Sequence, residues 1–163
     1  MDLRIRVQES DLMKSLVSSF GAIPSPMDSS LVLQALALGQ VDGAENNTAT
    51  YVSSSQFNVA KYYTFDEHSR IPDILVASKT VMDSLSKEDQ EIIKKAATDS
   101  VEVQKQAWKS NEEVMLTKMK DAGVKITELD QSSKNQFKNA VSPVYEKFAS
   151  KYTNLINQIE ETK

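Results

Sequence analysis

The sequence predicts an α/β fold with a small, mainly parallel sheet and one very long helix. Over the first 45 of its 163 residues, short stretches typical of strands and helices alternate in the order strand, helix, strand, helix, strand. Such a unit folds through right-handed crossovers into parallel strands. Further along, residues 87–122 keep helical spacing of apolar side chains without any Gly or Pro.

The opening strand is predicted from an alternation of apolar and polar side chains, the apolar ones being Leu3, Ile5 and Val7. Ser10 can cap a helix over residues 11–20, and Gly21 supplies its end. The apolar side of this helix is formed by Leu12, Met13, Leu16, Val17 and Phe20. We therefore expect the helix to pack on the sheet.

The next elements complete the parallel unit. Pro24 and Pro26 favour an extended segment over residues 23–27. A second helix over residues 30–38 ends before Gly39, and residues 40–45 form a short strand. A short helix is expected over residues 48–54.

The second half of the chain is predicted to be mostly helical. Residues 74–77 form a short apolar run that predicts a buried strand, and residues 80–85 form one or two helical turns. Ser86 and Asp89 mark the start of the long helix. Residues 124–129 alternate as a strand, and the closing helical region is kinked near Pro143.

The long helix has two interpretations. At 1.5 Å per residue it measures about 50 Å, longer than a globule of this size is expected to be across. Either it bends, or it lies across something larger than this chain. The alternative is an ordinary amphipathic core helix.

Composition excludes several classes of function. The formal net charge of −4 argues against a nucleic-acid partner, and the absence of Cys with a single His argues against metal centres and thiol chemistry. No apolar run approaches the roughly 20 residues that span a bilayer. Phosphate-binding glycine motifs are absent, so we expect no cofactor. Met1 and Asp2 lead directly into the first strand, and we expect no signal peptide in this chain.

Candidate site residues come from the ends of the predicted parallel strands, where open α/β sheets bind ligands. The segments are residues 6–10, 27–29 and 45–47. Arg4 and Arg6 share one strand face, which could be a solvated or salt-bridged surface. Alternatively, Arg6 lies nearer the strand's carboxyl end and presents its planar guanidinium to a carboxylate.

The other polar candidates also leave two interpretations open. Asn46 and Asn47 either form a turn and cap a helix, or offer an amide that donates to and accepts from a ligand. His68, in the polar segment 62–69, is expected to be a hydrogen-bonded structural residue rather than a catalyst.

Several motifs together resemble the solute-binding subunit of tripartite ATP-independent periplasmic (TRAP) transporters, the DctP type. They occur in the right order and spacing from Leu3 to at least Ala97, and they are LRIRVQES at 3–10, GAIPSPM at 21–27, ALALGQVDGAEN at 35–46, KYY at 61–63 and EHS at 67–69. The resemblance implies the C-terminal lobe of a two-lobed, venus-flytrap periplasmic-binding-protein (type II) fold. Members are longer, so the N-terminal lobe of the family is expected to be absent here.

The resemblance also implies a division of the chain and a set of partners. Residues 1–85 would form the ligand-binding lobe and a crossover segment, residues 86–123 a helix spanning both lobes, and residues 124–163 the C-terminal strand and helices. The implied function is an extracytoplasmic receptor that captures an organic acid in the periplasm. It would deliver that acid to the TRAP membrane permease subunits.

Site residues follow from the matched motifs. The resemblance implies that Arg6 holds the ligand carboxylate, that Asn46 contacts the ligand, and that Glu45 and His68 belong to the polar network behind it. Ser29 stands where the family often has an aromatic ring. Glu9 and Asn47 look like the branch that binds sugar acids such as uronates, because a carboxylate at Glu9 can accept two hydroxyl groups.

Two rival functions remain open at this point. An enzyme acting on a sugar acid would use Glu45, Glu67 or His68 as acid and base. A purely structural module would only mediate assembly. Under the receptor hypothesis this half-length chain binds its acid weakly or not at all, and Arg6→Lys abolishes binding.

Overall fold

The computed structural model describes residues 3–162, so the prediction about Met1 and Asp2 concerns residues outside that range. The elements in chain order are β1 (Arg4–Val7), α1 (Asp11–Ser19), β2 (Ile23–Pro26), η1 (Ser29–Leu31), α2 (Val32–Ala37), β3 (Gly43–Ala44), α3 (Thr48–Ser53), η2 (Gln56–Asn58), β4 (Tyr62–Phe65), α4 (Lys79–Ser84), α5 (Lys87–Asp121), β5 (Lys125–Glu128), α6 (Gln131–Ala140), α7 (Ser142–Ala149), η3 (Ser150–Tyr152) and α8 (Thr153–Glu161).

The predicted βαβαβ unit forms a three-stranded parallel sheet in the order β2-β1-β3. Arg6 of β1 stands opposite Ser25 of β2 on one side and Ala44 of β3 on the other. All three strands therefore end at the same edge. The sequence prediction of a small parallel sheet is confirmed.

Helix α1 packs its apolar side on this sheet, as expected from its spacing. Ser10 accepts a hydrogen bond from the Met13 amide at the helix start, and Gly21 adopts a φ of +78° just beyond its end. Leu12 was expected on the packed side, but it is 43% exposed. The core is closed from the other side by Val141, and its buried members are Val7, Met13, Leu16 and Val17.

A second, two-stranded parallel sheet pairs β4 with β5, with Tyr63 opposite Ile126. The pattern over residues 62–69 did not predict β4. Its core lies against α3 and the C-terminal end of α5, and the buried members are Tyr51, Val52, Met119 and Val124. This sheet holds the end of the long helix on the rest of the molecule.

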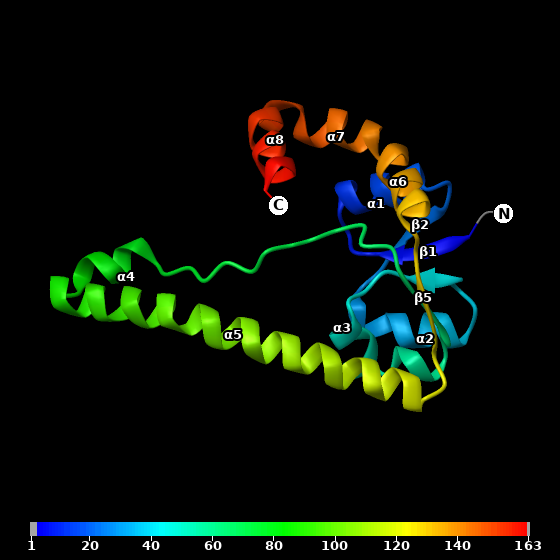
Figure 1. Cartoon of the computed structure of the whole chain (residues 1–163), viewed down its shortest axis with the longest axis horizontal. Helices are drawn as coiled ribbons and strands as arrows, with labels where there is room; N and C mark the ends of the chain where they lie inside the picture. The colour runs from blue at the N-terminus through cyan, green and yellow to red at the C-terminus, as the bar shows by residue number, and fades with distance from the viewer. Residues whose placement is uncertain (1–2, 163) are drawn as a thin grey trace.

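Helix α5 runs unbroken for 35 residues. Its only buried residue is Met119, near its end, so the interpretation as a core helix is wrong for most of its length. Figure 1 shows α4 and the first part of α5 projecting far from the sheets. We name residues 69–112 the arm, and residues 3–68 with 113–149 the lobe. None of the arm residues is buried.

Residues 74–77 are not a strand, which corrects the sequence prediction. They lie in a segment without regular structure between β4 and α4, and Ile74 and Val76 are more than three-quarters exposed. The prediction rested on the apolar and partly β-branched composition of this run, which is typical of a buried strand. No strand among residues 3–162 pairs with it.

The closing region is helical and breaks where Pro143 predicted. α6 ends at Ala140, α7 begins at Ser142, and Pro143 lies in the first turn of α7, where its missing amide costs nothing. α7 lies beside α1 (Figure 1). Between residues 3 and 162, no helix combines the length and the apolarity needed to cross a membrane.

Candidate ligand-binding site

The carboxyl ends of β1, β2 and β3 bring the predicted site segments to one edge. Neighbouring strands in a sheet lie about 4.8 Å apart. Because Arg6 stands opposite Ala44, residues Glu45 and Asn46 leave β3 at the level where β1 ends. Met27 leaves β2 beside them, and its amide donates to the Val7 carbonyl at 3.2 Å. This register makes one shared edge available for a ligand.

Arg6 is the central side chain of this edge. It is only 4% exposed, and its Nε and Nη2 donate to the Met27 carbonyl oxygen at 3.1 and 2.8 Å. Within residues 3–162 no carboxylate forms an ion pair with it. A buried cation without an anionic partner is costly. The geometry leaves the guanidinium fixed in orientation and still able to bind an acid.

Arg4, two residues earlier, forms a salt bridge on the sheet face. This was one of the two interpretations that the sequence left open for the arginines. Its Nε and Nη2 donate to the two carboxylate oxygens of Asp42 at 3.0 and 2.8 Å, and Nη2 also donates to the Gly39 carbonyl. This contact holds the Asp42 pKa down at about 2. The two arginines on one strand therefore have different roles, and among residues 3–162 Arg4 has an acidic partner whereas Arg6 has none.

A hollow of about 400 Å³ opens at Arg6. Its other lining residues come from the ends of β1 and β2, and they are Gln8, Glu9, Met27, Asp28 and Ser29. Glu9 lies at the rim, where Lys14 Nζ contacts its Oε1 at 3.0 Å. Ser29 lines the wall as a small polar side chain where a larger ring would fill space. Three of the predicted site residues therefore meet in one hollow.

Asn46 and Asn47 differ in their contacts. The Asn46 amide donates to Gln56 Oε1 at 3.1 Å, and its backbone carbonyl accepts from the Tyr63 hydroxyl at 2.7 Å. Asn47 accepts from the Thr50 amide at 2.7 Å and so caps α3. The capping interpretation therefore describes Asn47, whereas Asn46 is fixed in place by side chains behind it.

His68 forms a charged cluster behind the edge. Its Nδ1 lies 2.7 Å from Asp66 Oδ1, and its Nε2 lies 3.8 Å from Glu45 Oε2, close enough for charge attraction but too long for a hydrogen bond. The hydrogen bond with Asp66 and the charge of Glu45 outweigh burial and raise the pKa of His68 to about 9. His68 is therefore a cation at neutral pH that faces the residue preceding Asn46.

Glu67, a possible acid or base in the enzyme hypothesis, is bound by basic side chains and does not line the hollow at Arg6. Lys134 of α6 binds its Oε1 at 2.6 Å, and Arg70 approaches its other oxygen at 3.6 Å. These contacts lower the Glu67 pKa, the Lys134 hydrogen bond most of all. A lowered carboxyl pKa and a protonated His68 are both unfavourable for general-base catalysis at neutral pH.

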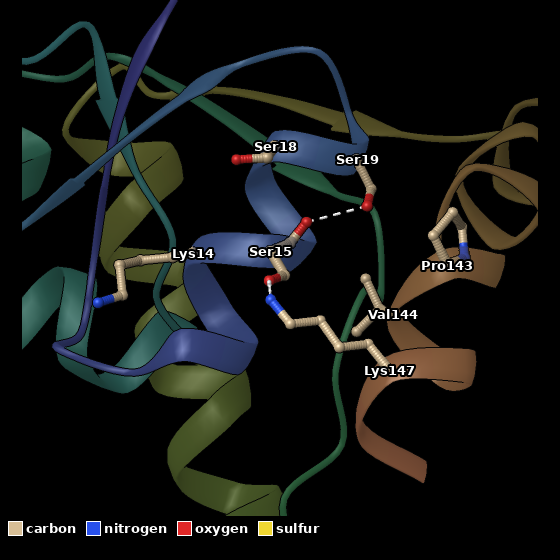
Figure 2. A pocket seen from close by; sticks show the side chains of 7 residues that line it. All are labelled: Lys14, Ser15, Ser18, Ser19, Pro143, Val144 and Lys147. Carbon is tan, nitrogen blue, oxygen red and sulfur yellow. Dashed lines mark hydrogen bonds between the residues drawn. The ribbon is translucent and has the colours of Figure 1, made fainter. Parts of the chain in front are cut away.

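A second hollow, of about 270 Å³, lies between α1 and α7 and contains none of the predicted site residues. Figure 2 shows serines of α1 facing Lys147 and Pro143, with the Lys147 ammonium donating to Ser15 Oγ at 3.3 Å. Apart from the buried Val144, its lining residues are partly or largely exposed, and neither of its two lysines is a buried charge. We therefore place the candidate site at Arg6.

Sequence reasoning missed several members of the site. Asp28 and Gln8 line the hollow, and Asp66, Tyr63 and Gln56 fix the groups behind it. Gln8 and Asp28 lie within the predicted segments 6–10 and 27–29, although neither was singled out as a site residue, so their positions at strand ends were a usable signal. No local pattern marks Gln56 or Asp66, because they reach the edge through tertiary packing. Within residues 3–162, no group of acidic or His side chains is arranged to hold a metal ion.

Comparison with known proteins gives consistent matches over almost the whole chain. A curated solute-binding protein of Chromohalobacter salexigens is 35% identical over 94% of this chain and 45% of its own length. A TRAP periplasmic solute-binding protein from Bradyrhizobium sp. BTAi1, solved with α/β-D-galacturonate, is 44% identical with a TM-score of 0.86 and covers 99% of this chain. One from Pseudomonas putida F1 with bound D-glucuronate is 32% identical with a TM-score of 0.90 over 99% of this chain.

These matches also show how the length of this chain compares with that of its relatives. This chain covers 54% and 52% of the two solved proteins, so its fold is that of one lobe and its connections in structures about twice as long. It likewise spans about half the length of the curated relatives it matches. The model of one bacterial family, the extracellular solute-binding proteins of family 7, matches residues 1–151. The chain therefore belongs to the DctP family of bacterial extracellular solute-binding proteins.

Proposed function

We propose that this chain forms the carboxylate-binding lobe of a periplasmic receptor that captures a sugar acid for a TRAP transporter. The observation that carries the proposal is Arg6, a buried guanidinium with a fixed orientation, no acidic partner among residues 3–162, and a hollow in front of it. The solved relatives with bound galacturonate and glucuronate support a uronate as the ligand class.

In this proposal each site residue has a defined task. Arg6 binds the ligand carboxylate through a charge-assisted pair, and Glu9 accepts ligand hydroxyls at the rim. Asn46 offers the ligand the hydrogen-bonding groups of its side-chain amide that are not used by Gln56. Asn47 and Ser29 border the ligand. His68 and Glu45 stiffen the strand end that carries Asn46. In this proposal the groups position a ligand and do not act on it, because the candidate acids and bases Glu45, Glu67 and His68 do not line the hollow.

The exposed arm supports a second lobe in the working receptor. Three of its apolar side chains, Ile71, Leu75 and Val103, are more than two-thirds exposed, and none of the residues 69–112 is buried. We assign residues 86–123 as the helix that spans the two lobes, residues 1–85 as ligand-binding lobe and crossover, and residues 124–163 as the C-terminal support. The remaining partners are the membrane permease subunits.

Energetics set the expected affinity of this chain. Two hydrogen bonds from a charged donor contribute about 3 to 6 kcal/mol, and millimolar binding needs about 4 kcal/mol. Micromolar binding needs about 8 kcal/mol, which requires further contacts from a second lobe. We therefore expect millimolar binding of D-glucuronate or D-galacturonate by the chain as it stands.

The test is an NMR titration of the ¹⁵N-labelled chain with each uronate and with its uncharged methyl ester. We expect saturable shifts at Arg6, Glu9 and Asn46 with the acid and none with the ester. Arg6→Lys should weaken binding at least tenfold, because an ammonium cannot form the two-pronged contact. Arg4→Lys is the matched control and should leave binding unchanged, since Asp42 occupies Arg4.

Three results would contradict the proposal or a part of it. Unchanged binding by Arg6→Lys would remove the anchor, and no shift with either acid at 50 mM would remove the site. Micromolar binding by this chain alone would contradict the need for a second lobe.

A further inference from the structure

The hollow at Arg6 is lined by more negative than positive side chains. Its lining contains one cation, Arg6, and two carboxylates, Glu9 and Asp28. The cation forms the floor, because it is almost fully buried, whereas the Glu9 side chain is 75% exposed at the rim. A ligand seated on Arg6 therefore extends toward acidic groups.

The two carboxylates are fixed in different ways. Asp28 Oδ1 accepts from the Ser30 hydroxyl at 2.6 Å and from the Ser30 amide at 2.9 Å. These two hydrogen bonds, and to a smaller extent the charge of Arg6, lower the pKa of Asp28. Glu9 is held at the rim by Lys14.

Among residues 3–162, Lys14 is the only other base that contacts either carboxylate, and its charge is already shared. Its ammonium lies 3.0 Å from Glu9 and 2.9 Å from Asp11, so one positive charge faces two carboxylates. It does not line the hollow. The charge of Asp28 is left uncompensated apart from Arg6, which the ligand carboxylate itself would occupy.

We propose that Glu9 and Asp28 make this hollow selective for acids with a single carboxylate, Glu9 accepting hydroxyl groups of the ligand while both residues repel a second carboxylate. The inference rests on the proposed function and deepens it. A hydroxyl group donates to a carboxylate without any like-charge repulsion, whereas a second carboxylate would face the like charges of Glu9 and Asp28 at the exposed mouth of the hollow. The site therefore rejects a dicarboxylate on electrostatic grounds rather than by size.

The test compares three six-carbon acids at constant ionic strength, because surface charge effects are screened by salt. D-Glucuronate carries one carboxylate, D-glucarate carries two, and D-gluconate is as open-chained as glucarate but has a hydroxymethyl group in place of the second carboxylate. NMR titration of the chain gives the dissociation constant of each. We expect glucarate to bind at least tenfold more weakly than glucuronate.

Variants separate charge from shape. In the double variant Glu9→Gln/Asp28→Asn we expect the glucarate-to-glucuronate ratio to fall to about threefold or less, with gluconate binding not strengthened. Asp11→Asn is the matched control, because it removes a carboxylate from the same helix start, outside the hollow, and should leave the ratio unchanged.

Each other outcome overturns the inference. Equal binding of glucarate and glucuronate by the unmodified chain would show no charge selection. If the double variant kept the same glucarate-to-glucuronate ratio of dissociation constants, the shape of the ligand and not its charge would cause the weak binding of glucarate. The same would follow if gluconate and glucarate binding both became stronger in that variant. Absence of glucuronate binding would overturn the proposed function together with the inference, whereas failure of the inference alone leaves glucuronate bound.

Discussion

The lobe and the arm of this chain use apolar side chains in opposite ways. In the lobe, apolar residues at helical and strand spacing are buried against each other, as Leu16 is against Val7. In the arm, the same residue types at the same spacing lie in the open, as Leu75 and Val101 do. The difference indicates that the apolar pattern in the arm specifies contacts that residues 3–162 do not supply. Much of the arm projects away from the two sheets (Figure 1).

The largest expected effect compares one leucine from each region. Leu16→Ala should lower the free energy of unfolding by about 2 to 4 kcal/mol, because it leaves a cavity in a packed core. Leu75→Ala should change it by less than about 0.5 kcal/mol, because Leu75 is 74% exposed. Urea denaturation followed by circular dichroism measures both. Equal losses would mean that the arm packs within this chain.

The next effect concerns His68, the last residue of the lobe before the arm. Its pKa is raised to about 9 in the folded state, against about 6.5 unfolded. Its contribution, roughly 2 to 3 kcal/mol, is therefore fully present below about pH 6.5 and is lost as the pH rises through about 9.

The measurement is unfolding by urea at pH 6.5 and pH 9.5. His68 is the single His of the sequence, so few other groups titrate in this range. His68→Gln should show a much smaller loss of stability between the two pH values. An equal pH dependence in this variant would rule out the Asp66–His68–Glu45 cluster as its source.

The smallest effect compares two helix caps. Ser10 caps α1 in the lobe, and Ser86 caps α5 in the arm by accepting from the Asp89 amide at 3.1 Å. Ser10→Ala should cost about 1 kcal/mol of global stability. Ser86→Ala should cost a similar amount locally, speeding amide exchange over residues 87–95 without moving the unfolding midpoint. A midpoint shift of equal size in both variants would show that arm and lobe unfold together.

Much of the fold was predictable because its signals are local. The alternation at Leu3, Ile5 and Val7, the cap at Ser10 and the uninterrupted spacing over residues 87–122 act within a few residues, and the structure has each of these elements. The strand predicted at residues 74–77 failed for the opposite reason. A strand exists only with a partner, and residues 3–162 provide none for it.

The candidate site also has features that the local sequence predicts and features that depend on tertiary contacts. The sequence by itself determined that Arg6 lies near the carboxyl end of a strand and that Glu9, Ser29 and Asn46 come shortly after strand ends. Because the strands pair in parallel, these residues share one edge of the sheet. Only the tertiary structure decided that Arg4 pairs with Asp42 while Arg6 is buried with no acidic partner among residues 3–162. The tertiary structure also decided that His68 is charged between Asp66 and Glu45. Burial and charge pairing depend on residues distant in sequence, whereas strand direction and helix spacing are set by the local chain.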